Sequence, residues 1–234
     1  MYPPQINSLV AVVAQWIEHR SSEPVVAGSN PPDRANNQGR FDLEQKILYF
    51  EQPGKHNQKK LIEYAKKRAD ELGIRNIVVA TTHGGTALAV KEAFDAPGLN
   101  LIAVSIAEGY SMREGWCLTP DERKKLEEKG VKVLTAGHAL GDGVASAFAE
   151  KYGGKPVEEI VRDAFYRFGQ GMKVCVEVVL MAADSGLIPM DKEIMAIAGT
   201  SSGADTCIIV KPAYPRTFFD LEIREILAKP RNLS

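Results

Sequence analysis

The residues best suited to chemistry in this 234-residue chain form one short run, TTHGGT, at residues 81–86. The run lies between an apolar stretch, NIVVA, and the sequence ALAV, which is typical of the start of a helix. Glycines let the backbone approach a ligand closely, and the free N–H groups at a helix start attract an anion. The three threonine hydroxyls would add donors, so this strand-to-helix corner suits a phosphate group.

A purely structural role is the alternative, because threonine can cap a helix and glycines can set a turn. The corner lacks the GKT or GKS ending of a P-loop and does not follow the G-x-G-x-x-G pattern. Three further loops rich in Gly, Ser, Thr or His follow predicted strands, at residues 106–118, 135–143 and 199–205. Ligands of open α/β sheets bind beyond the carboxyl ends of the strands, so the four loops together predict a ligand cleft.

Two histidines, His83 and His138, lie on these loops and are candidate acid–base groups or phosphate donors. A loop histidine without a catalytic role is the alternative for each. Glu108 and Asp142 share the loops, but no spacing rule ties them to the histidines. Because no HxxE or HExxH motif or carboxylate cluster accompanies them, we expect no metal site.

Aromatic and acidic residues add two further hypotheses. Tyr110 and Trp116 could stack on a planar ligand or cover the cleft, with ordinary packing as the alternative. Glu177 lies in MKVCVEVVLMAADSGLI, residues 172–188, a pattern that predicts a helix buried on nearly all sides. A buried acid needs a partner, unless Glu177 points to solvent at the edge of the helix.

Strand and helix patterns alternate along the chain. Apolar and β-branched runs predict strands at residues 46–50, 76–80, 100–105, 131–134, 193–198 and 206–210, and a terminal edge strand at 219–227, for which a short helix is the alternative. Helical periodicity predicts helices at 57–72, from the corner to about 94, at 120–130, up to about 152, and over 156–187, where Gly169 and Gly171 split the pattern in two. This alternation predicts an α/β fold, a three-layer sandwich with a mostly parallel sheet whose last strands run mixed.

Composition excludes several classes of protein. Lys and Arg number 29 against 30 Asp and Glu, so we expect no nucleic-acid partner. The sequence contains no apolar run near the ~18 residues of a membrane span, so we expect no membrane association. Cys117, Cys175 and Cys207 are odd in number and far apart, which fits free thiols in a reducing cytoplasm.

The first 39 residues differ from the rest in their proline pairs and polar run. The segment VAQWIEHRSSEPVVAGSNPPD resembles conceptual translations of transfer-RNA genes. We therefore expect residues 1–39 to be a disordered or non-native extension, and residues 40–234 to form one domain.

Four segments, NIVVATTHGGTALAV, LIAVSIAEG, VLTAGHAL and IMAIAGTSSGADTCIIVKPA, resemble the pyruvate kinase C-terminal domain-like family. Its members are stand-alone relatives of the α/β regulatory domain of pyruvate kinase, and KVCVEVVLMAADSGLIP looks especially close to the stand-alone group. The resemblance runs from about Lys46 to Pro230 and implies the same α/β fold. The catalytic barrel of pyruvate kinase is absent from this chain, so the resemblance does not imply pyruvate kinase activity.

In pyruvate kinase the corresponding corner holds the phosphates of a sugar bisphosphate, and residues 199–203 fall on a second effector loop; His83 departs from that pattern. Stand-alone relatives look able to hold flavin mononucleotide (FMN), whose phosphate and flat ring would suit an anion corner and an aromatic lid. The ligand-binding residues expected on this basis are Thr81, Thr82, His83, Gly84, Gly85, Thr86, Ser105, Glu108, Gly109, Gly137, His138, Gly199, Thr200, Gly203, Ala204 and Asp205.

We therefore expect a cytoplasmic protein that binds a phosphorylated small molecule, with FMN as the leading candidate. One alternative is an enzyme acting on a phosphorylated metabolite or through bound flavin, with His83 or His138 as the acid–base group. Another is a regulatory or assembly module, because the parent domain also packs subunits together; a homo-oligomer is expected.

Overall fold

The computed structural model describes residues 44–110 and 115–233. The chain divides into two compact units, Met1–Glu44 and Gln45–Ser234, and all described residues except Glu44 belong to the second. The predicted extension over residues 1–39 lies outside the described residues.

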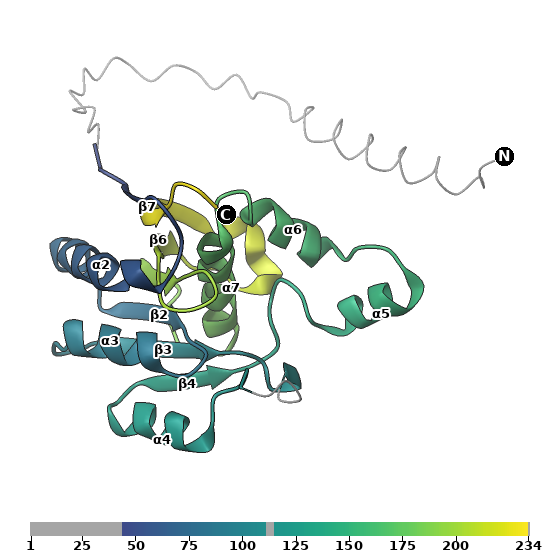
Figure 1. The fold of residues 1–234 in the computed structure, drawn as a ribbon, viewed down its shortest axis with the longest axis horizontal. Helices are drawn as coiled ribbons and strands as arrows, with labels where there is room; N and C mark the ends of the chain where they lie inside the picture. Colours follow the sequence, from purple (N-terminus) through teal and green to yellow (C-terminus); the bar gives the residue numbers. More distant parts are fainter. Residues whose placement is uncertain (1–43, 111–114, 234) are drawn as a thin grey trace, which may run out of the picture. The chain divides into compact units, whose positions relative to one another are not determined.

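Within the described residues, seven strands form one sheet in the order β1-β7-β6-β5-β2-β3-β4 (Figure 1). The strands are β1 (Leu48–Phe50), β2 (Asn76–Ala80), β3 (Asn100–Ser105), β4 (Lys132–Thr135), β5 (Ile194–Ala198), β6 (Thr206–Lys211) and β7 (Glu222–Pro230). Strands β5, β2, β3 and β4 are parallel neighbours, and β1 is parallel to β7. Strand β6 runs antiparallel to both β5 and β7, so the prediction of a mostly parallel sheet with mixed last strands is confirmed.

Six α-helices and three short 3-10 helices connect the described strands. The α-helices are α2 (Gln58–Leu72), α3 (Gly85–Ala93), α4 (Pro120–Glu128), α5 (Val144–Tyr152), α6 (Val157–Phe165) and α7 (Gln170–Asp184). The 3-10 helices are η1 (Lys55–Asn57), η2 (Glu108–Tyr110) and η3 (Pro215–Asp220).

Two hydrophobic cores, one on each face of the sheet, create the three layers. Helices α2, α3 and α4 pack on one face, where Leu61, Val90 and Leu126 belong to the same buried cluster. Helix α7 packs on the other face against β2, β3, β5 and β6. In Figure 1, α5 and α6 project to the side of this layered body. The predicted three-layer α/β architecture is therefore confirmed.

Local signals in the sequence explain where several helices begin and end. Gly73 adopts the left-handed conformation, with φ 67°, and ends α2 as its position predicts. Thr119 and Glu122 form a reciprocal capping box at the start of α4, just ahead of the first-turn proline. The cap at Thr119 fixes the start of the helix that follows the predicted cleft loop at residues 106–118.

Two details of the sequence prediction are wrong. The terminal strand begins at Glu222, because residues 215–220 form η3, and it lies between β1 and β6 rather than at the edge. Gly169 precedes α7 as predicted, but Gly171 lies inside its first turn and breaks nothing. A Cβ at Gly171 would lie 2.2 Å from Thr206 Oγ1, so glycine is required there by close packing against β6.

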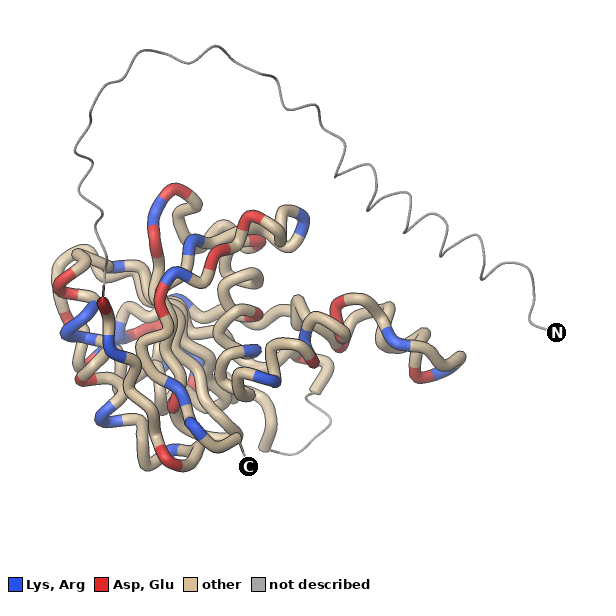
Figure 2. The backbone as a smooth tube through the Cα atoms, turned by 90° about the horizontal axis from the view of Figure 1, so that it is seen from above, with Lys and Arg blue, Asp and Glu red and all other residues tan. Residues whose placement is uncertain are grey.

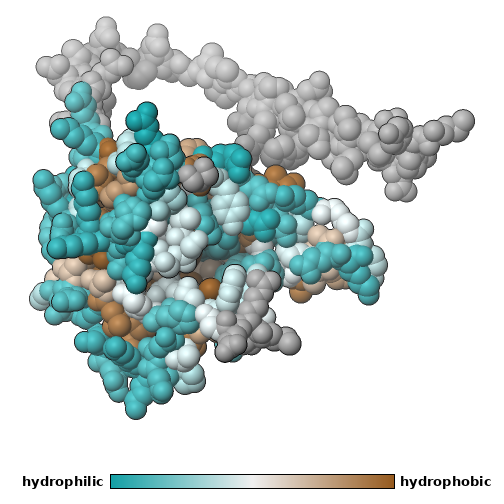
Figure 3. Space-filling view, viewed as in Figure 1, coloured by the Kyte–Doolittle hydropathy of each residue, from teal (hydrophilic) through white to brown (hydrophobic). Residues whose placement is uncertain are grey.

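The surface carries both signs of charge. Acidic and basic residues are interspersed along the described chain (Figure 2). Hydrophilic side chains prevail over the outer sides of α2 and α4 (Figure 3). No helix among the described residues is long and apolar enough to cross a membrane.

Candidate functional site

A cavity of about 490 Å³ lies at the edge of the sheet where β2, β3, β4 and β5 end. Each of the four loops predicted to form a cleft contributes to its lining. The lining residues from these strands and loops are Ala80, Thr81, Thr82, Thr86, Val104, Ser105, Ile106, Tyr110, Trp116, His138, Asp142, Gly199, Ser201, Ser202 and Gly203. The structure thus brings together loops that are far apart in the sequence, because parallel strands end at a common edge.

Seven of the predicted binding residues line this cavity: Thr81, Thr82, Thr86, Ser105, His138, Gly199 and Gly203. Nine do not line it: His83, Gly84, Gly85, Glu108, Gly109, Gly137, Thr200, Ala204 and Asp205. All nine belong to the same four loops, so the loops are placed as expected while individual side chains point elsewhere.

The corner between β2 and α3 presents small polar groups to the cavity. Gly84, with φ 82°, turns the chain into α3, and its N–H donates to Thr81 Oγ1 over 3.0 Å. Thr86 Oγ1 donates to Gln58 Oε1 over 3.1 Å, whereas Thr82 contributes a hydroxyl without a hydrogen-bond partner in the described chain. The first-turn N–H groups of a helix have no acceptors within the helix, so α3 begins with donors available to an anion.

His83 turns away from the cavity. Its Nδ1 lies 3.2 Å from Glu122 Oε2 at the start of α4, and its Nε2 lies 2.8 Å from the carbonyl oxygen of Gly115. The hydrogen bond with Glu122, together with that to Gly115, raises the pKa of His83 above 6.5. His83 therefore ties the corner to the loop after β3 and to α4, and both of its ring nitrogens have partners.

The loop at residues 199–205 is organised by a buried acid. Asp205 is fully buried, and its carboxylate accepts hydrogen bonds from the backbone N–H groups of Gly54 and Thr200 and from the hydroxyl of Thr206. Three donors satisfy this carboxylate without any ligand. Asp205 thus shapes the rim of the cavity rather than lining it.

Two glycines allow that loop to fold tightly. A Cβ at Gly199 would lie 2.5 Å from the carbonyl oxygen of Gly203. Gly203 has φ 74°, and a Cβ there would lie 2.6 Å from Lys55 Cα. No side chain fits at either position, and both glycines line the cavity.

Helix α7 forms a wall of the cavity that the sequence prediction did not include. With Tyr166 just before the helix, its lining residues are Gln170, Lys173, Val174, Glu177, Val178 and Met181. Their spacing of three and four residues marks one face of a helix. Sequence analysis singled out only Glu177 here, and the lysine four residues before it was the available signal of a partner.

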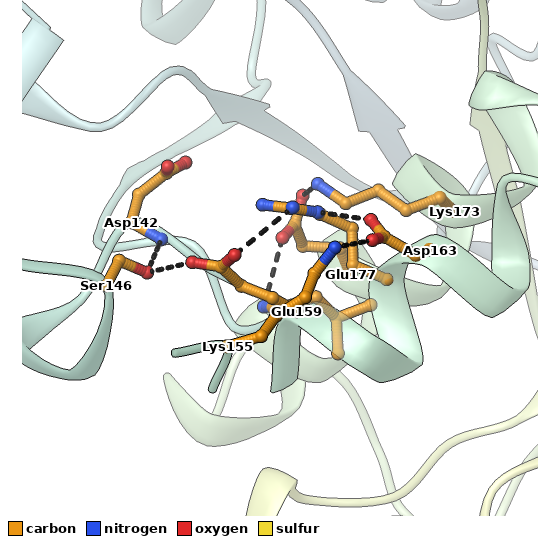
Figure 4. Close-up of polar contacts among 9 residues, drawn as sticks. Asp142, Ser146, Lys155, Glu159, Asp163, Lys173 and Glu177 are labelled. Carbon is orange, nitrogen blue, oxygen red and sulfur yellow. Dashed lines mark hydrogen bonds and ion pairs between the residues drawn. The ribbon is translucent and has the colours of Figure 1, made fainter. Parts of the chain in front are cut away.

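Lys173 and Glu177 form a buried ion pair in this wall, with Nζ and Oε2 separated by 2.5 Å (Figure 4). Their side chains are 9% and 5% exposed. The second carboxylate oxygen, Oε1, accepts the backbone N–H of Leu140 over 3.0 Å. Glu177 therefore joins α7 to the loop after β4, which carries His138.

A histidine–aspartate pair lies on that loop. His138 Nδ1 is 2.5 Å from Asp142 Oδ2, and Asp142 itself has φ 63°. Burial alone would raise the pKa of Asp142, but hydrogen bonds with His138 and Tyr110 and the charge of Lys173 hold that pKa below its usual value. Both residues of the pair line the cavity.

The aromatic rings form a short stack beside this pair. The ring centroid of Tyr110 lies 5.9 Å from that of Trp116 and 5.8 Å from that of His138. The hypothesis that Tyr110 and Trp116 reach the cleft is consistent with their place in the lining. Glu108 and Gly109, in η2 beside this stack, do not line the cavity.

The described residues contain no group of three or more His, Cys, Asp or Glu side chains placed to hold a metal ion. The cavity instead combines threonine and serine hydroxyls, the start of a helix, several aromatic rings and one lysine, and its two carboxylates, Asp142 and Glu177, are paired with His138 and Lys173. This donor set suits an organic ligand with an anionic group.

Fold and cavity together define an α/β domain with a ligand-sized hollow at its carboxyl edge. Residues 59–210 match the family model described as "Pyruvate kinase, alpha/beta domain". The chain belongs to this family.

Two solved structures match part of the chain. One is a pyruvate kinase from Cryptosporidium parvum, with 15% sequence identity and a TM-score of 0.32 over 60% of this chain and 20% of that one. The other is the Cryptosporidium parvum pyruvate kinase in complex with ADP, with 15% identity and a TM-score of 0.34 over 65% of this chain and 22% of that one. The chain therefore spans about a fifth of the length of these two enzymes.

Proposed function

We propose that this chain binds a phosphorylated small molecule in the cavity, with FMN as the leading candidate. The observation that carries the proposal is the division of the cavity into two parts of different chemistry. One part, at the β2–α3 corner, offers hydroxyls and the N–H groups of a helix start. The other offers aromatic rings and a wall of α7 in which Val174, Val178 and Met181 accompany the Lys173–Glu177 ion pair. Pyruvate kinase activity is not part of this proposal.

The residues present are compatible with FMN. A volume of about 490 Å³ falls within the range of roughly 300–1,000 Å³ of small-molecule sites. The hydroxyls of Thr81 and Thr82 and the first-turn backbone N–H of Thr86 would hold the phosphate, and the rings of Tyr110 and His138 would lie beside the planar group. Bound FMN would supply electron transfer, for which the protein provides binding and a defined electrostatic setting.

Titration of the purified full chain with FMN, riboflavin and inorganic phosphate tests the proposal. We expect FMN to bind more tightly than riboflavin and to compete with phosphate. Thr82→Val removes a cavity hydroxyl that has no partner within the described residues, and it should weaken FMN binding by about five- to tenfold. Thr217→Val, on the exposed surface of η3, is the matched control and should leave the affinity unchanged. Equal affinities for FMN and riboflavin would contradict the phosphate assignment.

A second candidate function is acid–base catalysis on the bound ligand. The observation that favours it is the contact of His138 with Asp142, which fixes one ring nitrogen and leaves Nε2 without a partner among the described residues. His138 rather than His83 is then the acid–base group, since both nitrogens of His83 are engaged. His138→Gln should abolish turnover of a phosphorylated substrate while changing its affinity less than tenfold; full turnover in this variant would exclude the role.

A further inference from the structure

The cavity reaches both faces of the sheet edge. Thr86 lies on α3, which packs in the core shared with α2 and α4. Lys173 and Glu177 lie on α7, which packs in the core on the opposite face. All three residues line the same cavity. A ligand held at the α3 corner therefore extends toward a buried charged pair across the edge of the sheet.

Stability does not explain this pair. Taking a lysine and a carboxylate out of water costs several kcal/mol per ion, and a well-packed apolar pair in the same place is often as stable. The neighbouring wall residues Val174, Val178 and Met181 show that apolar side chains fit this helix face. The ion pair thus needs another explanation than the packing of α7.

The hydrogen bonds of the pair are unevenly satisfied. Both carboxylate oxygens of Glu177 are engaged, one by Lys173 and the other by the N–H of Leu140. An ammonium group has three donors. Within the described residues, Glu177 Oε2 is the one hydrogen-bond acceptor of Lys173 Nζ, although the Tyr166 ring lies 5.9 Å away and the charge of Asp142 is close enough to interact. Lys173 therefore has donors to spare at a site only 7% exposed.

We propose that Lys173 is a second ligand anchor, which donates to an acceptor atom on the part of the ligand remote from the phosphate. The proposal rests on the proposed function above. Glu177 is a positioning residue that holds the lysine and the loop at Leu140 in place. The ligand is accordingly a phosphomonoester joined to a group that bears a carbonyl oxygen, a carboxylate or an electron-rich ring nitrogen. A sugar phosphate without such an acceptor would use only the corner.

The double variant Lys173→Met/Glu177→Gln tests this anchor. It removes both charges together, so no lone ion is left buried, and the amide oxygen of the new glutamine side chain can still accept the N–H of Leu140. We expect FMN to bind about tenfold more weakly, because a charge-assisted hydrogen bond is lost. Binding of inorganic phosphate should stay within twofold of the parental value, because the corner is untouched.

Lys155→Met and Thr82→Val complete the design. Lys155→Met removes an exposed lysine outside the cavity and should leave both affinities unchanged, whereas Thr82→Val should weaken both FMN and phosphate. Thermal unfolding followed by circular dichroism verifies that each variant folds.

A second readout separates an anchor from a packing effect. A lysine ammonium that donates to the ring lies closer to it than the carboxylate of Glu177 does, and it favours reduced flavin, whose ring is anionic, over oxidised flavin, whose ring is neutral. The affinity for reduced FMN relative to that for oxidised FMN should therefore fall severalfold in the double variant, which a loss of packing alone would not cause.

The possible failures are distinguishable. If the double variant binds FMN as tightly as the parental chain while Thr82→Val weakens it, the Lys173 anchor is wrong and the proposed function stands. If the parental chain binds phosphate but not FMN, the anchor and the FMN assignment are both wrong. If it binds neither, the proposed function itself fails.

Discussion

Helices α7 and α5 are both rich in apolar residues, yet α7 is mostly buried and α5 is mostly exposed. Twelve of the 15 residues of α7 are buried, including an ion pair. Only Ser146 is buried among the nine residues of α5, while Val144, Phe148 and Tyr152 are 77%, 62% and 71% exposed. The contrast teaches that contact with the sheet, and not apolar content, decides how much each helix contributes to the buried core.

The difference follows from how each helix is held. Helix α7 lies across β2, β5 and β6 and fills the core of one face. Helix α5 is fixed by polar contacts, because Ser146 accepts the N–H of Asp142 and donates to Glu159 of α6 (Figure 4). We therefore expect equivalent substitutions to have large effects in α7 and small effects in α5 and α6.

The largest expected effect is the loss of one partner of the buried pair. Lys173→Met alone leaves Glu177 charged and buried, which should lower the free energy of unfolding by about 4 kcal/mol. Lys173→Met/Glu177→Gln should cost much less, so the two changes are strongly coupled. Lys155→Met removes the exposed contact of Lys155 with Asp163 on α6 and is the matched control, with no measurable change expected. Urea unfolding of the parental chain, the control, the double variant and both single variants, Lys173→Met and Glu177→Gln, measures the coupling, and additive losses would contradict it.

Apolar truncation gives the next largest contrast. Leu180→Ala in α7 should lower the free energy of unfolding by about 3 kcal/mol, because Leu180 is almost fully buried. Phe148→Ala in α5 should change the free energy of unfolding of the monomer by less than about 0.5 kcal/mol, because the ring already faces water. Denaturant unfolding at low protein concentration compares the two variants. If both lose the same free energy of unfolding, the Phe148 ring does not face water and the expectation is wrong.

The exposed stripe on α5 is the surface we expect to serve the predicted homo-oligomer. Val144, Phe148 and Tyr152 are four residues apart and so share one side of the helix. Two copies of an exposed apolar stripe can pack against each other about a two-fold axis, which would remove these side chains from water. Phe148→Glu should reduce the sedimenting species to the monomer mass, whereas Lys155→Met should not. A parental chain that is already monomeric at high concentration would refute this expectation.

A smaller expected effect concerns a single methyl group. Gly171→Ala should cost about 2 kcal/mol, because the new Cβ would lie 2.2 Å from Thr206 Oγ1 and 2.9 Å from Asp205 Oδ1. Gly85→Ala, in the first turn of α3, has no atom within 4 Å of its new Cβ and should not lower the stability, because alanine favours a helix more than glycine does. Calorimetric unfolding compares the two, and a neutral Gly171→Ala would mean that β6 moves aside easily.

The same contrast explains what could be read from the sequence. The sheet, its cleft edge and the four loops were predictable, because strand and helix periodicity set the order of elements and parallel strands end together. The place of Lys173 in the cavity wall was not predictable, because a helix that is apolar nearly all round gives no sign of which side faces a cavity. The terminal strand was assigned to the edge because neither its alternation nor its composition indicates that the short β1 pairs outside it.

Individual side chains of the loops were the hardest to predict. The sequence places His83 and Asp205 in loops at the cleft, but their partners come from distant segments. Gly115 and Glu122 hold His83, and Gly54 contributes to holding Asp205, which is separated from it by 151 positions. Such contacts depend on tertiary packing, which local patterns do not contain.

The smallest expected effect concerns the contact of His83 with Glu122, a pair that is more exposed than Lys173 and Glu177, and the pH dependence of its contribution to stability. The hydrogen bond with Glu122 raises the pKa of His83, so its contribution to stability is fully present below pH 6.5 and is lost as the pH rises through the folded-state pKa. The Thr119 backbone N–H, with His83, lowers the pKa of Glu122, whose contribution is lost as the pH falls below 4.5. The contact therefore stabilises most between these two values. Because the side chains are 45% and 34% exposed, the gain is small beside that of the buried pair.

Nuclear magnetic resonance titration of the His83 ring measures this directly. Glu122→Gln should return the pKa of His83 toward 6.5, and it should flatten the changes of stability that the contact causes above pH 6.5 and below pH 4.5. Glu122→Gln should leave the His138 resonances as they are in the parental chain, because the partner of His138 is Asp142 on another loop. If Glu122→Gln leaves the His83 titration unchanged, the carbonyl oxygen of Gly115 rather than the carboxylate holds the proton on the ring, and the exposed pair makes no electrostatic contribution to compare with Lys173 and Glu177.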